Sequence, residues 1–380
     1  MTTTLATAPP SCAQVERRRA LADLGGQPVL GFVGPNWFAA VMGTGIVANA
    51  AATLPFRVPG LIGFATTVWV LDVLLLAVVT IATVLHWVHH PHVARRHLAD
   101  PVLGHFYGAP AMALMTVGTG ALLLGAPVVG HDVAVVLDLV LWTAGTLLGI
   151  ATAVVVPYRA FTSGSAAPDA AFGGWLMPVV PPMVSAATGP LLLPHLPAGQ
   201  WQLTMQVVCS MMFGLTLVAS VVVITLIWSR LVHHELGAAA AVPTLWIVLG
   251  PLGQSITAAH TLGASATSVL AAPYGKAFEA TSLVYGLPMF GFAALWLALA
   301  TAVTVRTARR GMPFSLTWWS FTFPVGTVVT GASGLAVVTQ AQVLVVCAGL
   351  LYVGLLVAWA VVATRTAHGV YRGHLLRAPA

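Results

Sequence analysis

Long apolar stretches separated by short polar segments dominate the chain. A helix that crosses a bilayer needs about 20 mostly apolar residues, and stretches of this length recur along the sequence. They predict about ten membrane-spanning helices, near residues 34–53, 61–86, 105–125, 133–156, 172–193, 203–229, 242–263, 277–305, 317–338 and 341–364. The segments between them leave no room for a separate soluble domain. We therefore expect an all-α integral membrane protein.

The predicted spans are of two alternating kinds. The even-numbered spans are mostly branched aliphatic, and among them only the eighth contains a proline, Pro288. Every odd-numbered span contains proline: Pro35, Pro110, Pro178, Pro181, Pro182, Pro190, Pro251 and Pro324. Proline kinks a helix and frees a backbone carbonyl, which a membrane tolerates only where the freed group faces protein or water. The pattern predicts about five helical hairpins, with the kinked helices inside around a central pore and the others outside against membrane lipids.

Charge is scarce and unevenly placed. Only 6% of the residues are charged, against roughly 25% in ordinary soluble domains, which excludes a soluble protein. If the N-terminus is inside and the spans alternate, Arg57 and Lys276 alone among the 15 Lys and Arg fall outside, as the positive-inside rule requires. We expect a multi-pass protein of the cell (inner or plasma) membrane with both termini cytoplasmic. Residues 1–30 are then a disordered cytoplasmic tail, 31–367 the transmembrane domain and 368–380 a cytoplasmic tail.

Small and polar residues form a stripe along each odd-numbered span when positions are placed at 100° per residue. Such stripes are also common where membrane helices simply pack together. Their occurrence on all the alternate helices favours a shared axis, the wall of a pore. The predicted pore-lining residues are Phe38, Met42, Gly45, Asn49, Met112, Thr119, Pro182, Ser185, Gln254, Thr257, Gly326 and Thr330.

The predicted pore contains no formal charge. The carboxylates inside the membrane, Asp72 and Asp138, lie on even-numbered spans, and a cation path would be expected to show acidic rings. Helix N-termini near the kinks could supply partial positive charge, so the path suits small inorganic or carboxylate anions. His260 flanks the stripe of the seventh span. It is either a proton sensor or a neutral histidine that is hydrogen-bonded between helices.

The histidine-rich run HWVHHPHVARRH, residues 86–97, raises a metal hypothesis. Imidazoles bind zinc or iron, so the alternative of a different class is a membrane metalloenzyme. However, Pro91 interrupts helical spacing, and among the other loops only His233 and His234 form a second histidine cluster. We expect no metal and no cofactor here. An interfacial basic loop that touches lipid headgroups is the favoured interpretation.

Several segments resemble the tellurite-resistance/dicarboxylate transporter family, which includes slow anion channels, malate permeases and sulfite efflux pumps. The resemblance covers about residues 30–365. It is carried by PNWFAAVMGTGIV (35–47), HFYGAPAMALMTVGTG (105–120), WLMPVVPPMVSAATG (175–189), GPLGQ (250–254) and FSLTWWSFTFPVG (314–326). The short GPLGQ match looks most like the sulfite-pump branch.

The resemblance implies a transporter rather than an enzyme, with an anion pore in each subunit of a homotrimer and no nucleic-acid partner. A phenylalanine on the ninth helix closes the pore in the family. The helical wheel places Phe323 on the stripe and Phe321 away from it, so Phe323 is the predicted gate. Sulfite, a C4-dicarboxylate such as malate, chloride and nitrate all remain possible substrates. A proton-coupled dicarboxylate or sulfite carrier that uses His260 is the alternative mechanism.

Overall fold

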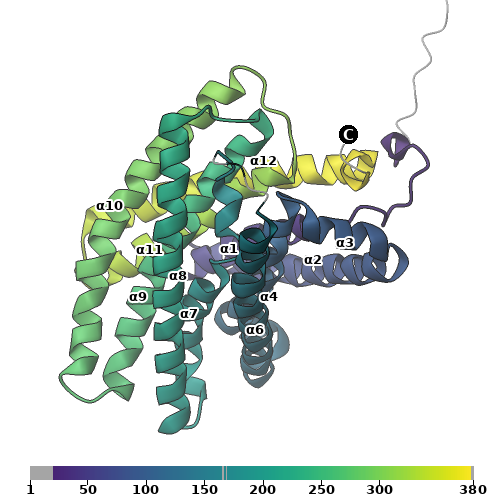
Figure 1. Cartoon of the computed structure of the whole chain (residues 1–380). Coiled ribbons are helices and arrows are strands. Elements are labelled where there is room, and N and C mark those ends of the chain that lie inside the picture. The colour runs from purple at the N-terminus through teal and green to yellow at the C-terminus, as the bar shows by residue number, and fades with distance from the viewer. Residues whose placement is uncertain (1–19, 165–166, 168, 378–380) are drawn as a thin grey trace, which may run out of the picture.

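The computed structural model describes residues 20–164, 167 and 169–377, and this part of the chain is helical, without a strand (Figure 1). Within it, 8 helical segments are long and apolar enough to cross a membrane. These are Leu61–His89 (α2), Leu103–Val129 (η3, α4, η4 and α5), His131–Ser163 (α6), Gln200–His233 (α8), Ala239–Val269 (η7 and α9), Tyr274–Ala308 (α10), Leu316–Thr339 (η8 and α11) and Gln342–Arg372 (α12). The chain is therefore a multi-pass membrane protein, as the sequence predicts.

Each helix of the proline-rich kind is preceded by a 3₁₀ segment. The pairs are η2 (Pro35–Trp37) with α1 (Phe38–Thr53), η3 (Leu103–Gly108) with α4 (Ala109–Gly120), η5 (Gly173–Leu176) with α7 (Pro181–Leu192), η7 (Ala239–Val248) with α9 (Leu249–Val269), and η8 (Leu316–Phe321) with α11 (Phe323–Thr339). In α4, α7 and α11 a proline occupies the first or second position. Proline is favoured there because that N–H has no partner within the helix anyway. These prolines therefore begin the α-helices and do not interrupt them midway.

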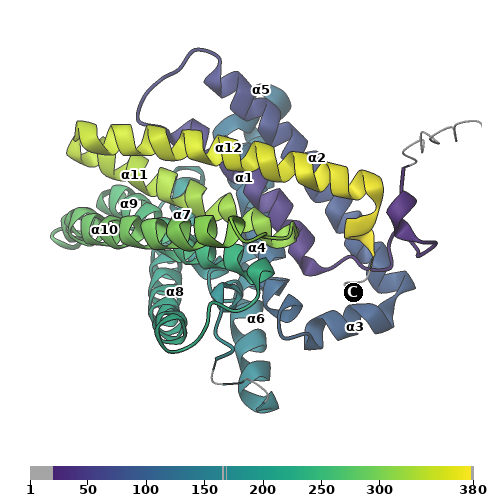
Figure 2. The ribbon, with the colours of Figure 1, turned by 90° about the horizontal axis from the view of Figure 1, so that it is seen from above.

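Burial separates the two kinds of helix. In the most apolar part of the α9 and α11 segments 78% of the residues are buried, against 22% in α2, α10 and α12. We call α1, α4, α7, α9 and α11 the inner helices and α2, α6, α8, α10 and α12 the outer helices. Each inner helix packs against the outer helix that follows it in sequence. Figure 1 shows this for α9 and α10, and Figure 2 for α11 and α12.

Two inner helices, α1 and α7, are not part of the 8 candidate segments. The α1 helix has 16 residues and α7 has 12, which is less than the length that spans a bilayer core, whereas the equally short α4 is part of a segment of 27 residues. Nearly all of their residues are nevertheless buried. The count of ten spans consequently stays a prediction, whereas the alternation of buried and exposed helices is observed.

Tryptophans of the outer helices donate hydrogen bonds to the backbone of inner helices. Trp69 of α2 donates its indole N–H to the carbonyl of Val117 at 3.1 Å, and Trp142 of α6 donates to the carbonyl of Ser185 at 3.1 Å. An indole N–H that is buried without a partner would be costly. These bonds fix the inner helices against the outer ones and so hold the site in place.

The histidine-rich run is not the short loop that the sequence predicts. The α2 helix continues to His89, and a new amphipathic helix, α3 (Pro91–Ala99), begins at Pro91. The prediction was wrong because a proline that interrupts one helix is also well suited to the first position of the next. His86 and His97 are buried between α2 and α3.

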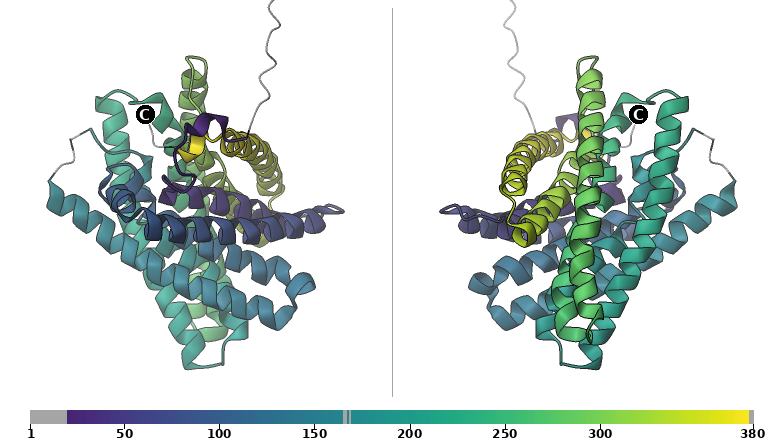
Figure 3. Two further views of the ribbon diagram at one scale, coloured as in Figure 1. Left: turned by 90° about the vertical axis from the view of Figure 1, so that its right-hand side faces the viewer. Right: turned by 90° about the vertical axis from the view of Figure 1, so that its left-hand side faces the viewer.

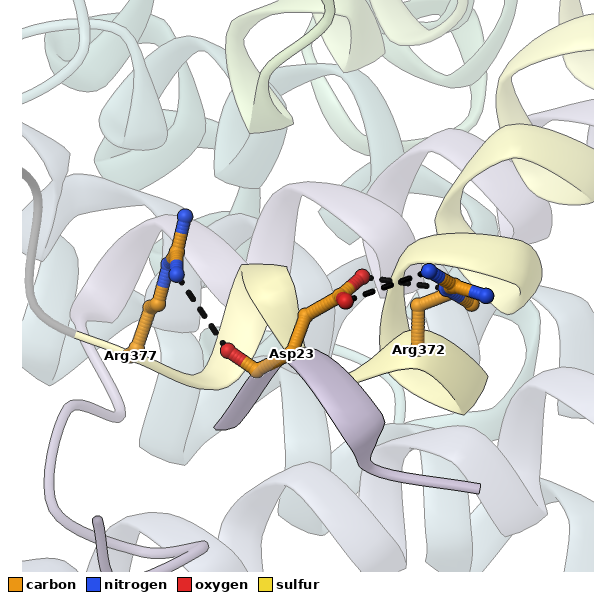
Figure 4. Close-up of polar contacts among 3 residues, drawn as sticks. All are labelled: Asp23, Arg372 and Arg377. Carbon is orange, nitrogen blue, oxygen red and sulfur yellow. Dashed lines mark hydrogen bonds and ion pairs between the residues drawn. The ribbon is translucent and has the colours of Figure 1, made fainter. Parts of the chain in front are cut away.

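The two ends of the described chain meet (Figure 3). Asp23, in the 3₁₀ turn η1 (Ala22–Leu24), forms an ion pair with Arg372 at 3.0 Å. Its backbone carbonyl accepts a hydrogen bond from the guanidinium group of Arg377 at 3.3 Å (Figure 4). The Arg372 guanidinium holds the pKa of Asp23 below its ordinary value. Helix α12 continues to Arg372, past the boundary predicted at residue 367. Of the predicted N-terminal tail, residues 1–19 lie outside the described residues.

Candidate functional site

Two cavities lie along the inner helices. The smaller, of about 20 Å³, is lined by Ala39, Met42, Phe106, Met112, Met177, Val180, Ile247, Gly250, Trp319, Ser320, Phe323 and Pro324. The larger, of about 280 Å³, is lined by Ile46, Asn49, Thr53, Thr116, Thr119, Leu123, Ala187, Thr188, Leu191, Gln254, Thr257, His260, Thr261, Thr330, Ser333, Gly334 and Val337. No residue of an outer helix lines either cavity.

The order of lining residues shows how the inner helices are directed. On α1, for example, Met42 lines the smaller cavity and Asn49, later in the chain, lines the larger one. The same order holds in the other four inner segments. All five inner segments therefore run in the same sense past one axis, with their N-terminal halves around the smaller cavity and their C-terminal halves around the larger.

The structure brings together most, but not all, of the predicted pore-lining residues. Met42, Met112 and Phe323 line the smaller cavity. Six residues line the larger cavity: Asn49, Thr119, Gln254, Thr257, His260 and Thr330. Five line neither: Phe38, Gly45, Pro182, Ser185 and Gly326. All five are buried within the inner helices.

The residues outside the cavities have identifiable partners. Ser185 lies 2.8 Å from the hydroxyl of Thr146 on α6. Gly45 lies against the carboxyl group of Asp72 on α2, where any added Cβ would collide. In both cases the small residue faces an outer helix. A stripe of small residues on a wheel marks close approach to another helix as well as an open path, and the sequence alone does not separate the two.

The two cavities share no lining residue. Ile46, at the near end of the larger cavity, packs against Gly326 on α11. Phe323, one turn before Gly326, lines the smaller cavity and is 3% exposed. Phe321 points elsewhere, since its ring packs on those of Trp246 and Trp318 at centroid distances of 5.2 and 5.7 Å.

Many of the residues that line the larger cavity are Ser, Thr, Asn or Gln, and none is Asp, Glu, Lys or Arg. The hydroxyls of Thr257 on α9 and Thr330 on α11 form a hydrogen bond of 2.8 Å in its wall. His260 packs its ring against Gly334 of α11. Imidazole is therefore the one kind of titratable side chain in this wall.

The buried carboxyl groups lie behind the inner helices and not in a cavity. Asp72 and Asp138 are fully buried, and neither forms a hydrogen bond within the described residues. Asp72 faces Gly45, and Asp138 faces Gly118 on α4. Because positions 45 and 118 are glycines, the carboxyl groups of Asp72 and Asp138 fit against the inner helices. Neither carboxyl group lines one of the two cavities.

Sequence reasoning missed some lining residues. Thr188 has the small polar character of its neighbours, and a complete wheel of α7 could have included it. Ile46 gave no such signal, because an aliphatic residue in a membrane helix is unremarkable by composition. Only its contact with Gly326, which lies on α11 between Pro324 of the smaller cavity and Thr330 of the larger one, singles it out.

The histidine run does not assemble a metal site within the described residues, where no group of His, Cys, Asp and Glu could hold an ion. The rings of His86 and His97 stack with centroids 5.3 Å apart, and His86 Nδ1 lies 2.8 Å from the carbonyl oxygen of Leu30. Burial, followed by the proximity of His86, lowers the pKa of His97. This region packs the segment before α1 against α2 and α3.

A bundle of apolar helices whose buried members enclose two aligned cavities defines a membrane transport protein. The chain belongs to the SLAC1 family, described as voltage-dependent anion channels, whose model matches residues 33–367. It is a transporter and not an enzyme.

Its relatives include both fungal and archaeal transporters. The chain is 29% identical over 305 residues to the sulfite efflux pump SSU1 of Arthroderma otae, which covers 79% of this chain and 80% of the relative. It is 28% identical over 346 residues to an uncharacterized transporter of Methanocaldococcus jannaschii, which covers 90% and 95%. The sulfite efflux pump SSU1 of Trichophyton rubrum is 28% identical over 79% of this chain and 80% of its own length.

Proposed function

We propose that the protein carries small anions across the membrane along the axis of the inner helices. The path runs from the smaller cavity, past Phe323 and Ile46, to the larger cavity. The observation that supports this most directly is the alignment of two cavities on the same helices, with no acidic residue in either lining. An apolar plug blocks an ion because it excludes the water that the ion needs.

The short helices α1 and α7 belong to the wall of this path. Both contribute to the larger cavity, through Asn49 and Thr188, and the smaller cavity includes Met42 and Val180. Without α1 and α7, the wall of the path would have a gap at each of these two helices. We therefore propose that both segments, with their 3₁₀ lead-ins, complete a ring of ten helices. We further propose that the smaller cavity lies at the cytoplasmic end, because the positive-inside rule favours a cytoplasmic N-terminus.

Sulfite is the first substrate to test, because relatives of this chain bear the name sulfite efflux pump. Purified protein in liposomes should carry sulfite, and the same assay with chloride, nitrate and malate ranks the other anions. Empty liposomes give the background. Transport of none of these anions above background would contradict the proposed function.

A proton-coupled carrier is a second candidate mechanism, favoured by the position of His260 in the larger cavity. If protonation of this imidazole drives transport, a pH gradient should accelerate anion flux in the wild type. The variant His260→Gln should remove that acceleration while passive flux continues. Equal acceleration in both proteins would exclude His260 as the coupling group, and no acceleration in either would leave a simple channel.

A further inference from the structure

Helix α12 holds two consecutive tryptophans that come shortly before Phe323. The indole N–H of Trp319 donates a hydrogen bond to the hydroxyl of Thr366 at 3.1 Å. The guanidinium group of Arg365 lies over the ring of Trp318, 4.9 Å from its centroid. Both tryptophans belong to η8, the segment that leads into α11. Adjacent residues of one outer helix therefore hold adjacent residues of an inner segment.

The two contacts differ in burial and in position. Trp319 is 3% exposed and lines the smaller cavity together with Phe323, whereas Trp318 is half-buried and lines neither cavity. Arg365 is exposed, so water weakens its attraction to the ring of Trp318. Thr366 is buried, and the hydrogen bond that it accepts is shielded from water. Loss of this bond would leave a buried indole N–H without a partner, which is the costly condition.

Trp319 also fixes the turn that precedes Phe323. Its backbone carbonyl accepts hydrogen bonds from the N–H of Thr322 at 3.1 Å and from the hydroxyl of Thr322 at 2.7 Å. Thr322 is fully buried and directly precedes Phe323. Gly43 of α1 lies against the Trp319 ring and the Thr322 hydroxyl, and a Cβ at position 43 would collide with both. The ring of Trp319 is thus enclosed between α1 and α12, and its place determines where the turn holds Phe323.

We propose that Thr366 is a positioning residue of the gate, which keeps Phe323 in the closed path by holding the ring of Trp319. This inference rests on the proposed anion path and adds a residue of an outer helix to its closure. In Thr366→Val the indole N–H has no partner as long as η8 stays against α12. An arrangement in which η8 moves away from α12 exposes that N–H to water and displaces Phe323. The variant therefore raises the free energy of the closed path more than that of the open one.

The test measures sulfite flux in liposomes per folded, reconstituted protein. Valine has nearly the shape of threonine, so Thr366→Val removes the hydroxyl with little change in packing. Its flux should exceed that of the wild type by about tenfold, the effect on an equilibrium of one buried donor that is left unpaired. Thr366→Ser keeps a hydroxyl and should show the wild-type flux. In the background of Phe323→Ala, Thr366→Val should cause no further rise, because the closed path is already lost.

Thr304 provides a matched control. Its hydroxyl accepts the indole N–H of Trp246 at 2.9 Å, and this bond also joins an outer helix, α10, to an inner segment, η7. Trp246 lines neither cavity. Thr304→Val should therefore lower the stability of the protein and leave sulfite flux at the wild-type level.

Three results would overturn the inference. They are an unchanged flux in Thr366→Val, an equal rise in Thr366→Val and Thr304→Val, and a further rise when Thr366→Val is added to Phe323→Ala. Failure of the proposed function looks different, because sulfite flux would then stay at background in the wild type and in Phe323→Ala alike.

Discussion

The side chain of Ile46 on α1 packs directly against the backbone of Gly326 on α11, so that any side chain at position 326 would collide with it. This contact joins two inner helices between the two cavities, one turn from Phe323. The wheel of α11 alone would place Gly326 at the lumen. The structure shows instead that the missing side chain leaves room for Ile46.

Gly326→Ala should destabilise the protein by about 1–3 kcal/mol, because an added methyl group in a tightly packed site forces its neighbours to move. The collision is with one side chain, so Ile46→Ala should relieve it. A thermal melt in detergent of both single variants and the double variant measures the coupling. Strict additivity of the two effects would show that the residues do not meet.

The hydroxyl pair of Thr257 and Thr330 links α9 and α11 in the wall of the larger cavity at 2.8 Å. Replacing either residue by valine keeps the shape and removes the bond, which should cost about 0.5–1.5 kcal/mol. The double variant should cost less than the sum of the two, since one bond is lost in all three proteins. Full additivity in the thermal melts would contradict the pairing.

Cysteine labelling separates the positions that line the larger cavity from those that face outer helices. In a background without Cys12, Cys209 and Cys347, Gln254→Cys and Thr330→Cys should react with a small anionic thiol reagent. A transported anion should slow that reaction by competition.

Ser185→Cys is the control for this labelling. Ser185 is fully buried against Thr146, and cysteine has nearly its shape, so this variant should stay unreactive. Equal labelling at positions 185, 254 and 330 would contradict the assignment of Gln254 and Thr330 to the cavity wall and of Ser185 to a contact between helices.

The terminal ion pair should persist well into the acid range. Arg372 lowers the pKa of Asp23 in the folded protein, so its contribution to stability is complete above the ordinary pKa of the carboxyl group and is lost only as the pH falls through the lowered value. Trypsin cleavage after Arg372 should be slow at pH 7 in the wild type and faster in Asp23→Asn.

Glu235→Gln is the control for this cleavage, because Glu235 is an exposed acid at the end of α8. It should leave the cleavage rate unchanged. A rate in Asp23→Asn equal to that of the wild type would show that the ion pair does not hold the two ends together.

Residue patterns alone predict the class of this fold well, for a physical reason. Lipid removes water as a hydrogen-bond partner, so helices are required and their apolar length is nearly fixed. Proline and polar residues mark the buried helices because lipid penalises both. The start of α3 at Pro91 and the length of α12 escape this reasoning, since they lie where the chain leaves the bilayer and the constraint ends.

The candidate site is predicted less completely. Polar stripes identify Asn49, Gln254 and Thr330, which do line the larger cavity. Gly45 and Ser185 have the same small or polar character but face α2 and α6, where Asp72 and Thr146 meet them. A wheel gives the angle of a residue and not the identity of its neighbour. The identity of the neighbour is known only from the tertiary packing, which also shows the contact between Ile46 and Gly326.

The central claim is that Phe323 closes an anion path, and sulfite flux in liposomes tests it most directly. Phe323→Ala should raise the flux well above that of the wild type, because removing the ring admits water to the closed region. Phe321→Ala should leave it near the wild-type level, since that ring packs on Trp246 and Trp318 away from both cavities.

If Phe323 serves only as core packing, its truncation costs about 3–5 kcal/mol of stability and flux does not rise. The measurement is therefore the initial rate of sulfite flux per folded, reconstituted protein for Phe323→Ala, Phe321→Ala and the wild type. The account predicts a large increase in Phe323→Ala alone. An unchanged or reduced rate in folded, membrane-inserted Phe323→Ala would contradict it.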